Sequence, residues 1–384
     1  MEKIRRLQKC MKGKLKAALF IDGSNRFYLT GMKSSAGAVL VTQEEAWLFI
    51  DFRYLEEAQQ KVKNCKVMEA VHLYDQVREM LQSRDIGEVS IVSGAVTVEA
   101  WRRMSVELAP VQVDCSCNLD RMIEKLRTEK DETEIGYHRE AQHITDMAFE
   151  HILDFIRPGI TELDVARELG YTMEKLGGDD HHYNFIVASG KNSALPHGFA
   201  TNKVLEKGDF LTMDFGAVVH GYFADMTRTV ALGSVSEEQE RIYNIVYEAQ
   251  QRAFEKIRAG AVCRDVDAAA RNYIYECGYK GCFSHELGHG VGIDVHENPR
   301  FNETCTDPLV SGTVITVEPG IYLKGRFGVR IEDMVVIRED GFEDLTCSPK
   351  KLIILQKVWV CIFETGRFQQ DSKNINKTIK MQCI

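Results

Sequence analysis

The 384-residue sequence has no apolar run of the ~18 residues needed to cross a membrane. Its first residues, MEKIRRLQKCMKGKLK, carry charges throughout and lack the apolar centre of a signal peptide. Positive charge is not in excess either, because 48 Lys and Arg residues stand against 57 Asp and Glu residues, for a net charge of −9. A nucleic-acid partner would require a basic face. We therefore expect a cytoplasmic protein that binds neither membranes nor nucleic acids.

The cysteines do not form a recognisable metal or disulfide framework. There are 11 of them, an odd number, and only Cys115 and Cys117 lie close together. Their spacing differs from that of a zinc ribbon. Reduced, mainly structural thiols are therefore expected, which is typical of cytosolic proteins.

Length and hydrophobic pattern favour two domains. Residues 1–125 alternate short apolar runs (AALFI, AGAVLV, EAWLFID, VSIVSG) with helical stretches such as RYLEEAQQKVKN, which is typical of a small α/β domain. The polar stretch KLRTEKDETE, which starts at Lys125, then precedes a helical pattern that starts at Ile135. One hydrophobic core rarely organises so long a chain. We place the boundary after residue 125 and assign 126–355 to the second domain.

The second domain contains a faint internal repeat. RPGITELDVARELGYTMEKLG aligns with RAGAVCRDVDAAARNYIYECG, and KGDFLTMDFGAVVHGYF aligns with SGTVITVEPGIYLKGRF. The second pair places Asp214 opposite Glu318, and His197 precedes the first hairpin as His289 precedes the second. Two such halves facing each other would bring carboxylates from both into one cleft. Chance similarity between two helix-and-hairpin units is the alternative.

Four carboxylates in these hairpins indicate a metal site. Asp214, Asp225 and Glu318 interrupt largely apolar strands, where a buried charge is costly unless it is paired or metal-bound, and Glu332 follows in FGVRIEDMVVI. One such acid could form a salt bridge, but four of them beside a glycine-rich histidine loop favour a pair of divalent cations. Carboxylates with one imidazole suit manganese, cobalt or zinc. Two such metals can activate a bridging water and polarise a peptide carbonyl.

A competing motif is HELGH, starting at His285, which matches the H-E-x-x-H pattern of zinc metalloproteases. That pattern requires a helix, whereas Gly288, Gly290 and Gly292 at alternate positions disfavour one. The third histidine of the extended motif would stand at position 295, which is Val295. We therefore favour the two-metal site.

In the two-metal interpretation His289 is a ligand, and His285 and His296 line the cleft as hydrogen-bond donors to a substrate carbonyl or to the tetrahedral intermediate. A lone histidine is more often structural than catalytic. Three within twelve residues, among glycines, favour a functional role, and His197 gains support from its place in the repeat.

Several segments resemble the Xaa-Pro aminopeptidase and prolidase family. They are PHG at 196–198, MDFGAVVHGYFADMTRT, HELGHGVGIDVHENP, VEPGIY and GVRIEDMVVI, while YLTG and IDFRYLEEA resemble the family's N-terminal domain. The resemblance covers nearly the whole chain to Leu355. It implies a creatinase-like N-terminal domain, a C-terminal α+β pita-bread domain whose pseudo-two-fold symmetry explains the repeat, and a homodimer.

The resemblance also implies a role for each candidate residue. Asp225 and Glu332 match bridging carboxylates, Asp214 the second ligand of one metal, and His289 with Glu318 the ligands of the other. Glu318 is in addition similar to a proton shuttle, and the substrate and intermediate contacts correspond to His197, His285 and His296. Arg330 corresponds to an arginine that orients the site; its structural alternative is a salt bridge that holds Glu332.

The implied function is an Xaa-Pro aminopeptidase with two divalent cations, expected to be manganese, with cobalt or zinc as alternatives. Its substrates would be peptides with proline at the second position. An Xaa-Pro dipeptidase remains open, because the ligands do not discriminate between substrate lengths. A nonenzymatic peptide-binding relative is disfavoured, because all five ligands are present. Residues 356–384 lie beyond the family pattern, and we expect them to be dispensable.

Overall fold

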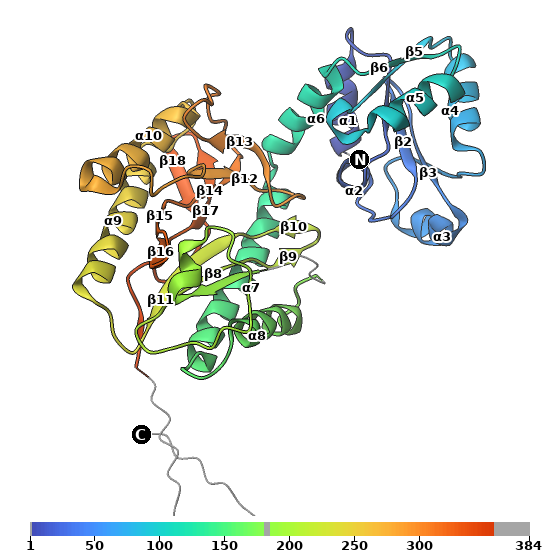
Figure 1. Cartoon of the computed structure of the whole chain (residues 1–384). Coiled ribbons are helices and arrows are strands. Elements are labelled where there is room, and N and C mark those ends of the chain that lie inside the picture. The colour runs from blue at the N-terminus through green and yellow to red at the C-terminus, as the bar shows by residue number, and fades with distance from the viewer. Residues whose placement is uncertain (1, 180–184, 357–384) are drawn as a thin grey trace, which may run out of the picture.

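The computed structural model describes residues 2–179 and 185–356, which form two domains (Figure 1). The first domain is built on a sheet with the strand order β4-β3-β2-β1-β5-β6, in which β2 runs antiparallel to both of its neighbours and the other pairs are parallel. Its strands are β1 Ala17–Phe20, β2 Ala38–Thr42, β3 Ala46–Ile50, β4 Lys66–Glu69, β5 Glu88–Ile91 and β6 Gln112–Asp114. The predicted apolar runs therefore form the central strands.

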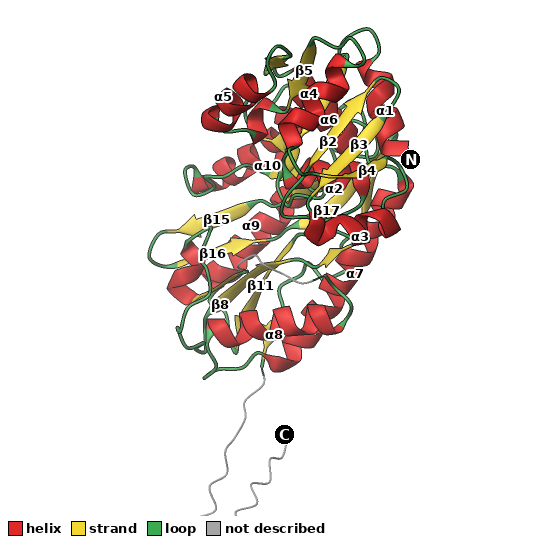
Figure 2. Ribbon diagram, turned by 90° about the vertical axis from the view of Figure 1, so that its right-hand side faces the viewer, coloured by secondary structure: helices red, strands yellow, loops and turns green. Residues whose placement is uncertain are grey.

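Helices cover both faces of this sheet (Figure 2). Every residue of β1, β2 and β3 is buried, and alternate residues enter two separate cores. Helices α1, α2, α3 and α6 contribute to one core, and α4 and α5 to the other. The helices are α1 Glu2–Met11, α2 Gly23–Thr30, α3 Phe52–Lys61, α4 Leu73–Gln82, α5 Val98–Glu107 and α6 Asn118–Thr128.

The second domain starts its helices with local capping signals. The side chains of Asp131, Thr161 and Ser236 each accept a hydrogen bond from the backbone amide three residues on, and the backbone amide of each donates to the side chain of that same residue in a capping box. The helices are α7 Glu132–Phe155, α8 Glu162–Lys175, α9 Glu237–Phe254 and α10 Cys263–Ile274. Short 3₁₀ or π turns occupy Ser93–Ala95, Gly190–Ala194 and Tyr275–Tyr279.

The predicted repeat is confirmed. In each half a helix pair precedes a long antiparallel strand pair, with a small hairpin inserted between the two strands. The first half contains β7 Ile186–Ser189, β8 Phe210–Phe215, β9 Val218–Val219, β10 Tyr222–Phe223 and β11 Met226–Leu232. The second contains β12 Gly288–Gly290, β13 Glu297–Phe301, β14 Val314–Val317, β15 Gly320–Leu323, β16 Phe327–Arg330, β17 Asp333–Arg338 and β18 Gly341–Asp344.

The two halves share their cores and meet at their strand ends. The sheet orders are β19-β11-β8-β7, where β19 is Ile354–Leu355, and β13-β12-β14-β17-β18. Met334 and Val336 of β17 pack with the helices of the first half, whereas Phe210 and Ala231 pack with those of the second. The amide of Glu332 donates to the carbonyl of Thr227 across the junction. Side chains at these strand ends therefore lie between the halves.

The predicted boundary after residue 125 falls inside α6. We propose to place it at residues 129–131, between α6 and α7. Apart from Gln356, the segment 356–384, which was expected to be dispensable, lies outside the described residues. Among the helices that the structure describes, none combines the length and apolar content needed to cross a membrane.

Candidate metal centre

All the predicted site residues line one cavity of about 340 Å³ between the two halves. The five proposed ligands come from strands or strand ends: Asp214 from β8, Asp225 from the junction of β10 and β11, His289 from β12, Glu318 from the end of β14, and Glu332 from the junction of β16 and β17. The wall is completed by His197, His285, His296 and Arg330. The fold thus brings together nine residues that lie up to 135 positions apart in sequence, from His197 to Glu332.

Three of the five proposed ligands lie crowded together in the buried part of the cavity. One donor atom each from Asp225, His289 and Glu332 lie within 4.8 Å of one another, and all three side chains are buried. Burial raises the pKa of Asp225 and of Glu318 well above the ordinary value, and the nearby Glu332 adds to both shifts. Burial and then Asp214 raise the pKa of Glu332 to about 8. These carboxyls resist ionisation unless positive charge enters the cavity.

His289 presents a nitrogen lone pair to these acids. Its Nδ1 lies 3.1 Å from the carbonyl of Gly290, which can only accept, so Nδ1 carries the proton. Burial lowers the pKa of His289 to about 3 and keeps the ring neutral. The unprotonated Nε2 then faces Glu318 Oε1 at 3.4 Å and Asp225 Oδ2 at 3.6 Å. A nitrogen lone pair and carboxylate oxygens that face one another at this distance suit a cation between them. A histidine that ligates a metal usually carries its proton on the other ring nitrogen, as His289 does here.

Arg330 contacts the other side of the cluster. Its Nη2 donates to Asp214 Oδ2 at 2.7 Å, and its Nε donates to Thr227 Oγ1 at 2.9 Å. Thr227 Oγ1 in turn donates to Glu332 Oε2 at 2.6 Å. The ion pair expected between Arg330 and Glu332 is therefore formed with Asp214 instead, and Arg330 reaches Glu332 through a hydroxyl. Arg330 lies two residues before Glu332, but β16 ends between them, so the alternation of a single strand does not apply.

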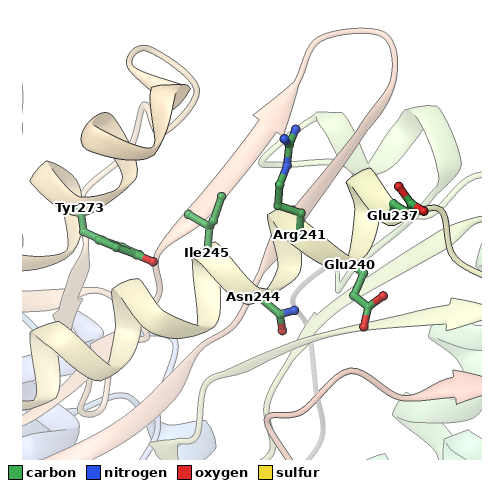
Figure 3. A pocket seen from close by; sticks show the side chains of 6 residues that line it. All are labelled: Glu237, Glu240, Arg241, Asn244, Ile245 and Tyr273. Carbon is green, nitrogen blue, oxygen red and sulfur yellow. The ribbon is translucent and has the colours of Figure 1, made fainter.

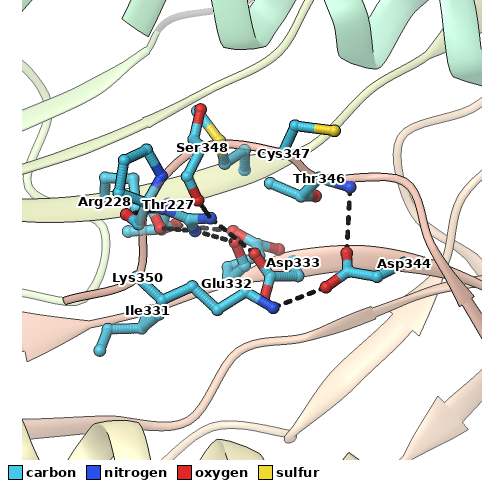
Figure 4. Close-up of polar contacts among 12 residues, drawn as sticks. Thr227, Arg228, Ile331, Glu332, Asp333, Asp344, Thr346, Cys347, Ser348 and Lys350 are labelled. Atoms are coloured by element: carbon cyan, nitrogen blue, oxygen red, sulfur yellow. Dashed lines mark hydrogen bonds and ion pairs between the residues drawn. The ribbon is translucent and has the colours of Figure 1, made fainter. Parts of the chain in front are cut away.

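A second buried arginine fixes the backbone that carries Glu332 (Figure 4). Arg228 donates to the carbonyl of Glu332 at 2.6 Å, to Asp333 Oδ1 at 2.7 Å and to the carbonyl of Ser348 at 2.8 Å. Lys350 Nζ lies 2.8 Å from the other Asp333 oxygen. Because Asp333 follows Glu332 directly, its side chain points to the opposite face. Glu332 is thus held from behind by an ion cluster that does not line the cavity.

His285 uses both ring nitrogens within the protein. Nδ1 donates to the carbonyl of Glu286 at 2.7 Å, and Nε2 accepts from the hydroxyl of Tyr322 at 2.8 Å. Burial and Arg330 lower the pKa of His285 to about 3, so the ring is neutral. The expected donation from His285 to a substrate therefore requires one of these bonds to break. In this structure the ring instead anchors Tyr322, which also accepts from Arg330 Nη1 at 2.8 Å.

The predicted equivalence of His197 and His289 is wrong. Asp214 pairs with Ile186 of β7, and the amide of Glu318 bonds to Leu287, so the residue that corresponds to His289, two positions further on, is Ala188. His197 lies instead on the loop after β7, which folds back through a bridge between Ile186 and Phe199. This return places the His197 side chain at the cavity from a different direction.

The loop that carries His197 is anchored by one buried carboxylate. Glu162, at the start of α8, is fully buried and accepts from the amide and hydroxyl of Ser189 at 2.7 and 2.8 Å. It also accepts from the amide and hydroxyl of Thr201 at 3.1 and 2.6 Å and from Asn192 Nδ2 at 3.1 Å. Both ends of the loop are therefore tied to the same side chain.

The segment HELGH is not a helix. Residues 285–287 are irregular, and His289 lies in β12, so the two histidines do not share a helical face. His296 approaches from the turn after β12, and its ring centroid lies 4.3 Å from that of His289. The rejection of the zinc-protease pattern is confirmed.

Sequence inspection missed several residues of the site. Thr227 and Thr316 lie two positions from Asp225 and Glu318, so strand alternation could have identified them as neighbours on the same face. The amide of His289 donates to Thr316 Oγ1 at 3.0 Å. No comparable signal marks the remaining cavity wall, which is formed by Ile186, Pro196, Phe199, Glu286, Val295 and Arg300.

A second depression, of about 440 Å³, lies on the outer side of α9 and α10 (Figure 3). It is lined by Glu237, Glu240, Arg241, Asn244, Ile245 and Tyr273. Four of these six are exposed and come from successive turns of one helix. The depression therefore lies apart from the buried acidic cluster and offers no comparable chemistry.

Comparison with known proteins identifies both domains. Residues 136–339 match the model of metallopeptidase family M24, and residues 3–128 match the creatinase/prolidase N-terminal domain. The uncharacterised peptidase YqhT of Bacillus subtilis is 39% identical over 338 residues, which cover 88% of this chain and 95% of that protein.

Solved structures show the same architecture. An Xaa-Pro dipeptidase from Bacillus anthracis superimposes with a TM-score of 0.88 at 40% identity, over 92% of this chain and 99% of that one. An X-Pro aminopeptidase from Thermotoga maritima gives a TM-score of 0.86 at 36% identity, with the same coverage of both chains. The chain therefore belongs to metallopeptidase family M24, with a creatinase/prolidase-type N-terminal domain preceding its pita-bread catalytic domain.

Proposed function

We propose that this metallopeptidase is an Xaa-Pro aminopeptidase, which hydrolyses the peptide bond between an N-terminal residue and a following proline. The observation that carries the proposal is the crowding of four carboxylates and the neutral His289 around one cavity, which suits a multivalent cation site. Relatives of both substrate lengths support the proline preference, because one is named an Xaa-Pro dipeptidase and the other an X-Pro aminopeptidase.

In this proposal the site would hold two divalent cations, with manganese as the first candidate. The ligands would be Asp214, Asp225, His289, Glu318 and Glu332. When bound, such ions lower the pKa of a coordinated water and polarise the scissile carbonyl. Glu318 would accept the proton of the attacking water and pass it to the leaving imino nitrogen, a general acid/base role for which a carboxylate at the edge of the cavity is suited. The substrate is oriented by His197 and His296 at the cavity wall.

An Xaa-Pro dipeptidase is the second candidate, and Arg300 favours it. Arg300 lines the cavity, and its guanidinium Nη1 lies 3.4 Å from Glu286 Oε2. An arginine in this place could pair with the free carboxylate of a dipeptide. We further propose that the protein acts as a homodimer, as the family resemblance implies, and that it is located in the cytoplasm.

The test is amino-acid release from an Xaa-Pro dipeptide and an Xaa-Pro-Xaa tripeptide, with manganese and again after chelation. Metal-dependent release from the tripeptide is expected for the aminopeptidase, and release from the dipeptide alone would identify the dipeptidase. Absence of release from either peptide, with metal present, would refute the proposed function.

A further inference from the structure

The turn between β12 and β13, residues 291–296, which ends at Glu297 of β13, contributes to the cores of both domains. Val291 is buried with the helices of the catalytic domain, whereas Ile293, only two residues on, packs into the N-terminal core with residues of α1, α2 and α6. The same turn presents Val295 and His296 to the catalytic cavity. The position of His296 therefore depends on how the turn sits between the domains.

The turn is closed around the carboxylate of Glu297. Glu297 Oε1 accepts the amides of Ile293 at 3.0 Å and of Asp294 at 3.2 Å. Gly292 leaves room for this carboxylate, because a Cβ at this position would lie 2.3 Å from the same oxygen and would displace it. The Glu297 side chain is only 7% exposed, so its charge needs buried partners.

Those partners come from the end of the N-terminal domain. Arg127 in α6 places Nη2 2.6 Å from Glu297 Oε1 and 2.5 Å from Asp294 Oδ2, and Lys130 Nζ lies 3.3 Å from Glu297 Oε2. Although burial opposes ionisation, Lys130 and Arg127 hold the pKa of Glu297 below its ordinary value.

The N-terminal domain also orients Arg127 and the turn directly. Arg127 Nη1 donates to Asn25 Oδ1 at 3.2 Å, and Ser24 Oγ donates to Asp294 Oδ1 at 2.7 Å. Both partners lie in α2, whose Tyr28 packs in the same core as Ile293. The arginine is thus a rigid connection between the N-terminal domain and the turn.

We propose that Arg127 is a positioning residue for His296. By pairing with Glu297 and Asp294, it holds the turn so that the His296 ring stays beside His289 at the cavity. The N-terminal domain thereby contributes to the active site through a residue that does not line it. This inference rests on the proposed peptidase function for its kinetic test and on the geometry alone for its structural test.

The kinetic test is a double-mutant cycle between Arg127→Met and His296→Ala, assayed on a proline peptide. Arg127→Met should lower kcat/KM about tenfold to a hundredfold, as expected for a misplaced orienting group, with metal content unchanged. Arg127→Lys should recover part of the loss. In the His296→Ala background the same substitution should have less than about a threefold effect, because its target is gone.

The matched control is Arg139→Met, which removes the bidentate pair at 2.7 and 2.9 Å between Arg139 of α7 and Glu343 of β18, a pair that does not contact the turn. Its activity should stay at the wild-type level. Equal losses from Arg127→Met with and without His296 would overturn the proposal, because the effect would then not pass through that histidine.

The structural test is hydrogen–deuterium exchange, which needs no substrate. Arg127→Met should accelerate exchange in peptides covering 291–297, where the amides of Ile293 and Asp294 bond to Glu297, and leave peptides covering α8 unchanged. Unchanged exchange in the turn, or a uniform increase throughout the chain, would contradict the proposal. Wild-type protein without peptidase activity would refute the proposed function, while exchange would still decide whether Arg127 braces the turn.

Discussion

At the residue scale, His285 shows how a histidine that lines the cavity can support the site without being one of the proposed metal ligands. Its two ring nitrogens bind the carbonyl of Glu286 and the hydroxyl of Tyr322, which in turn accepts from Arg330. We expect His285→Ala to slow turnover about tenfold to a hundredfold while metal content stays at the wild-type level.

Tyr322→Phe removes the hydroxyl that bonds to His285. It should slow turnover by the same order, again with the metal retained. Steady-state kinetics and elemental analysis of the purified variants check both expectations. Metal loss in His285→Ala comparable to that of a ligand variant would contradict the separation of supporting residues from ligands.

His138, which does not line the metal cavity, should make the stability of the fold depend on pH. Its Nδ1 donates to the carbonyl of Phe223 at 2.7 Å, and its Nε2 is buried with no partner in the part of the chain that the structure describes. Burial, and then Lys130, lowers the pKa of His138 to about 3. The unfolded chain binds a proton below its ordinary pKa of about 6.5, whereas the folded protein does not, so stability falls as the pH falls through this window.

Chemical denaturation at pH 7 and pH 5 measures this contribution. His138→Asn keeps a donor near Nδ1 but does not titrate, so it should lose about 2 kcal/mol less than the wild type between these two values. His72→Asn is the control, because the exposed His72 ring stays in water after folding. Equal pH slopes for the wild type and His138→Asn would show that His138 is not held neutral.

At the element scale, the loop between β7 and β8 depends on Glu162 of α8. Glu162→Ala leaves the donors of the buried Ser189, the half-buried Asn192 and the exposed Thr201 without their acceptor, and we expect a loss on the order of 3 kcal/mol in the free energy of unfolding. Because the same loop carries His197, turnover should fall as well, with metal content unchanged.

Glu168→Ala on the same helix is the matched control. Glu168 pairs with His151 at 2.7 Å on the surface, where such pairs contribute little, so its removal should change stability by less than about 0.5 kcal/mol. A Glu162→Ala variant as stable as this control would rule out the anchoring role.

The elements also show how far local sequence could predict structure. The apolar runs predicted the central strands of the first sheet. The two aligned hairpins predicted the pairing of β8 with β11 and of β14 with β17, because both signals are local in sequence. The return of the His197 loop onto β7 and the insertion of Ile293 into the other domain depend on long-range packing. Periodicity contains no information about such contacts, so the alignment of His197 with His289 failed.

At the scale of the whole molecule, the repeat explains why the acids meet. Equivalent strand ends of the two halves face each other, so each half supplies two carboxylates: Asp214 and Asp225 from one, Glu318 and Glu332 from the other. Residue types and order were sufficient to predict that these side chains share one site. The backing ion cluster of Arg228, Asp333 and Lys350 was not predicted, because Arg–Asp pairs are common and nothing in the sequence marks these as neighbours.

The most direct test of the metal centre is the number of manganese ions that the chelator-treated protein binds in a calorimetric titration. Wild-type protein should bind two ions per chain, and Asp225→Ala, which removes a carboxylate proposed to bridge both ions, should lose high-affinity binding together with activity. A wild-type stoichiometry below two, or unchanged binding in Asp225→Ala, would contradict the assignment of these carboxylates to a dinuclear site.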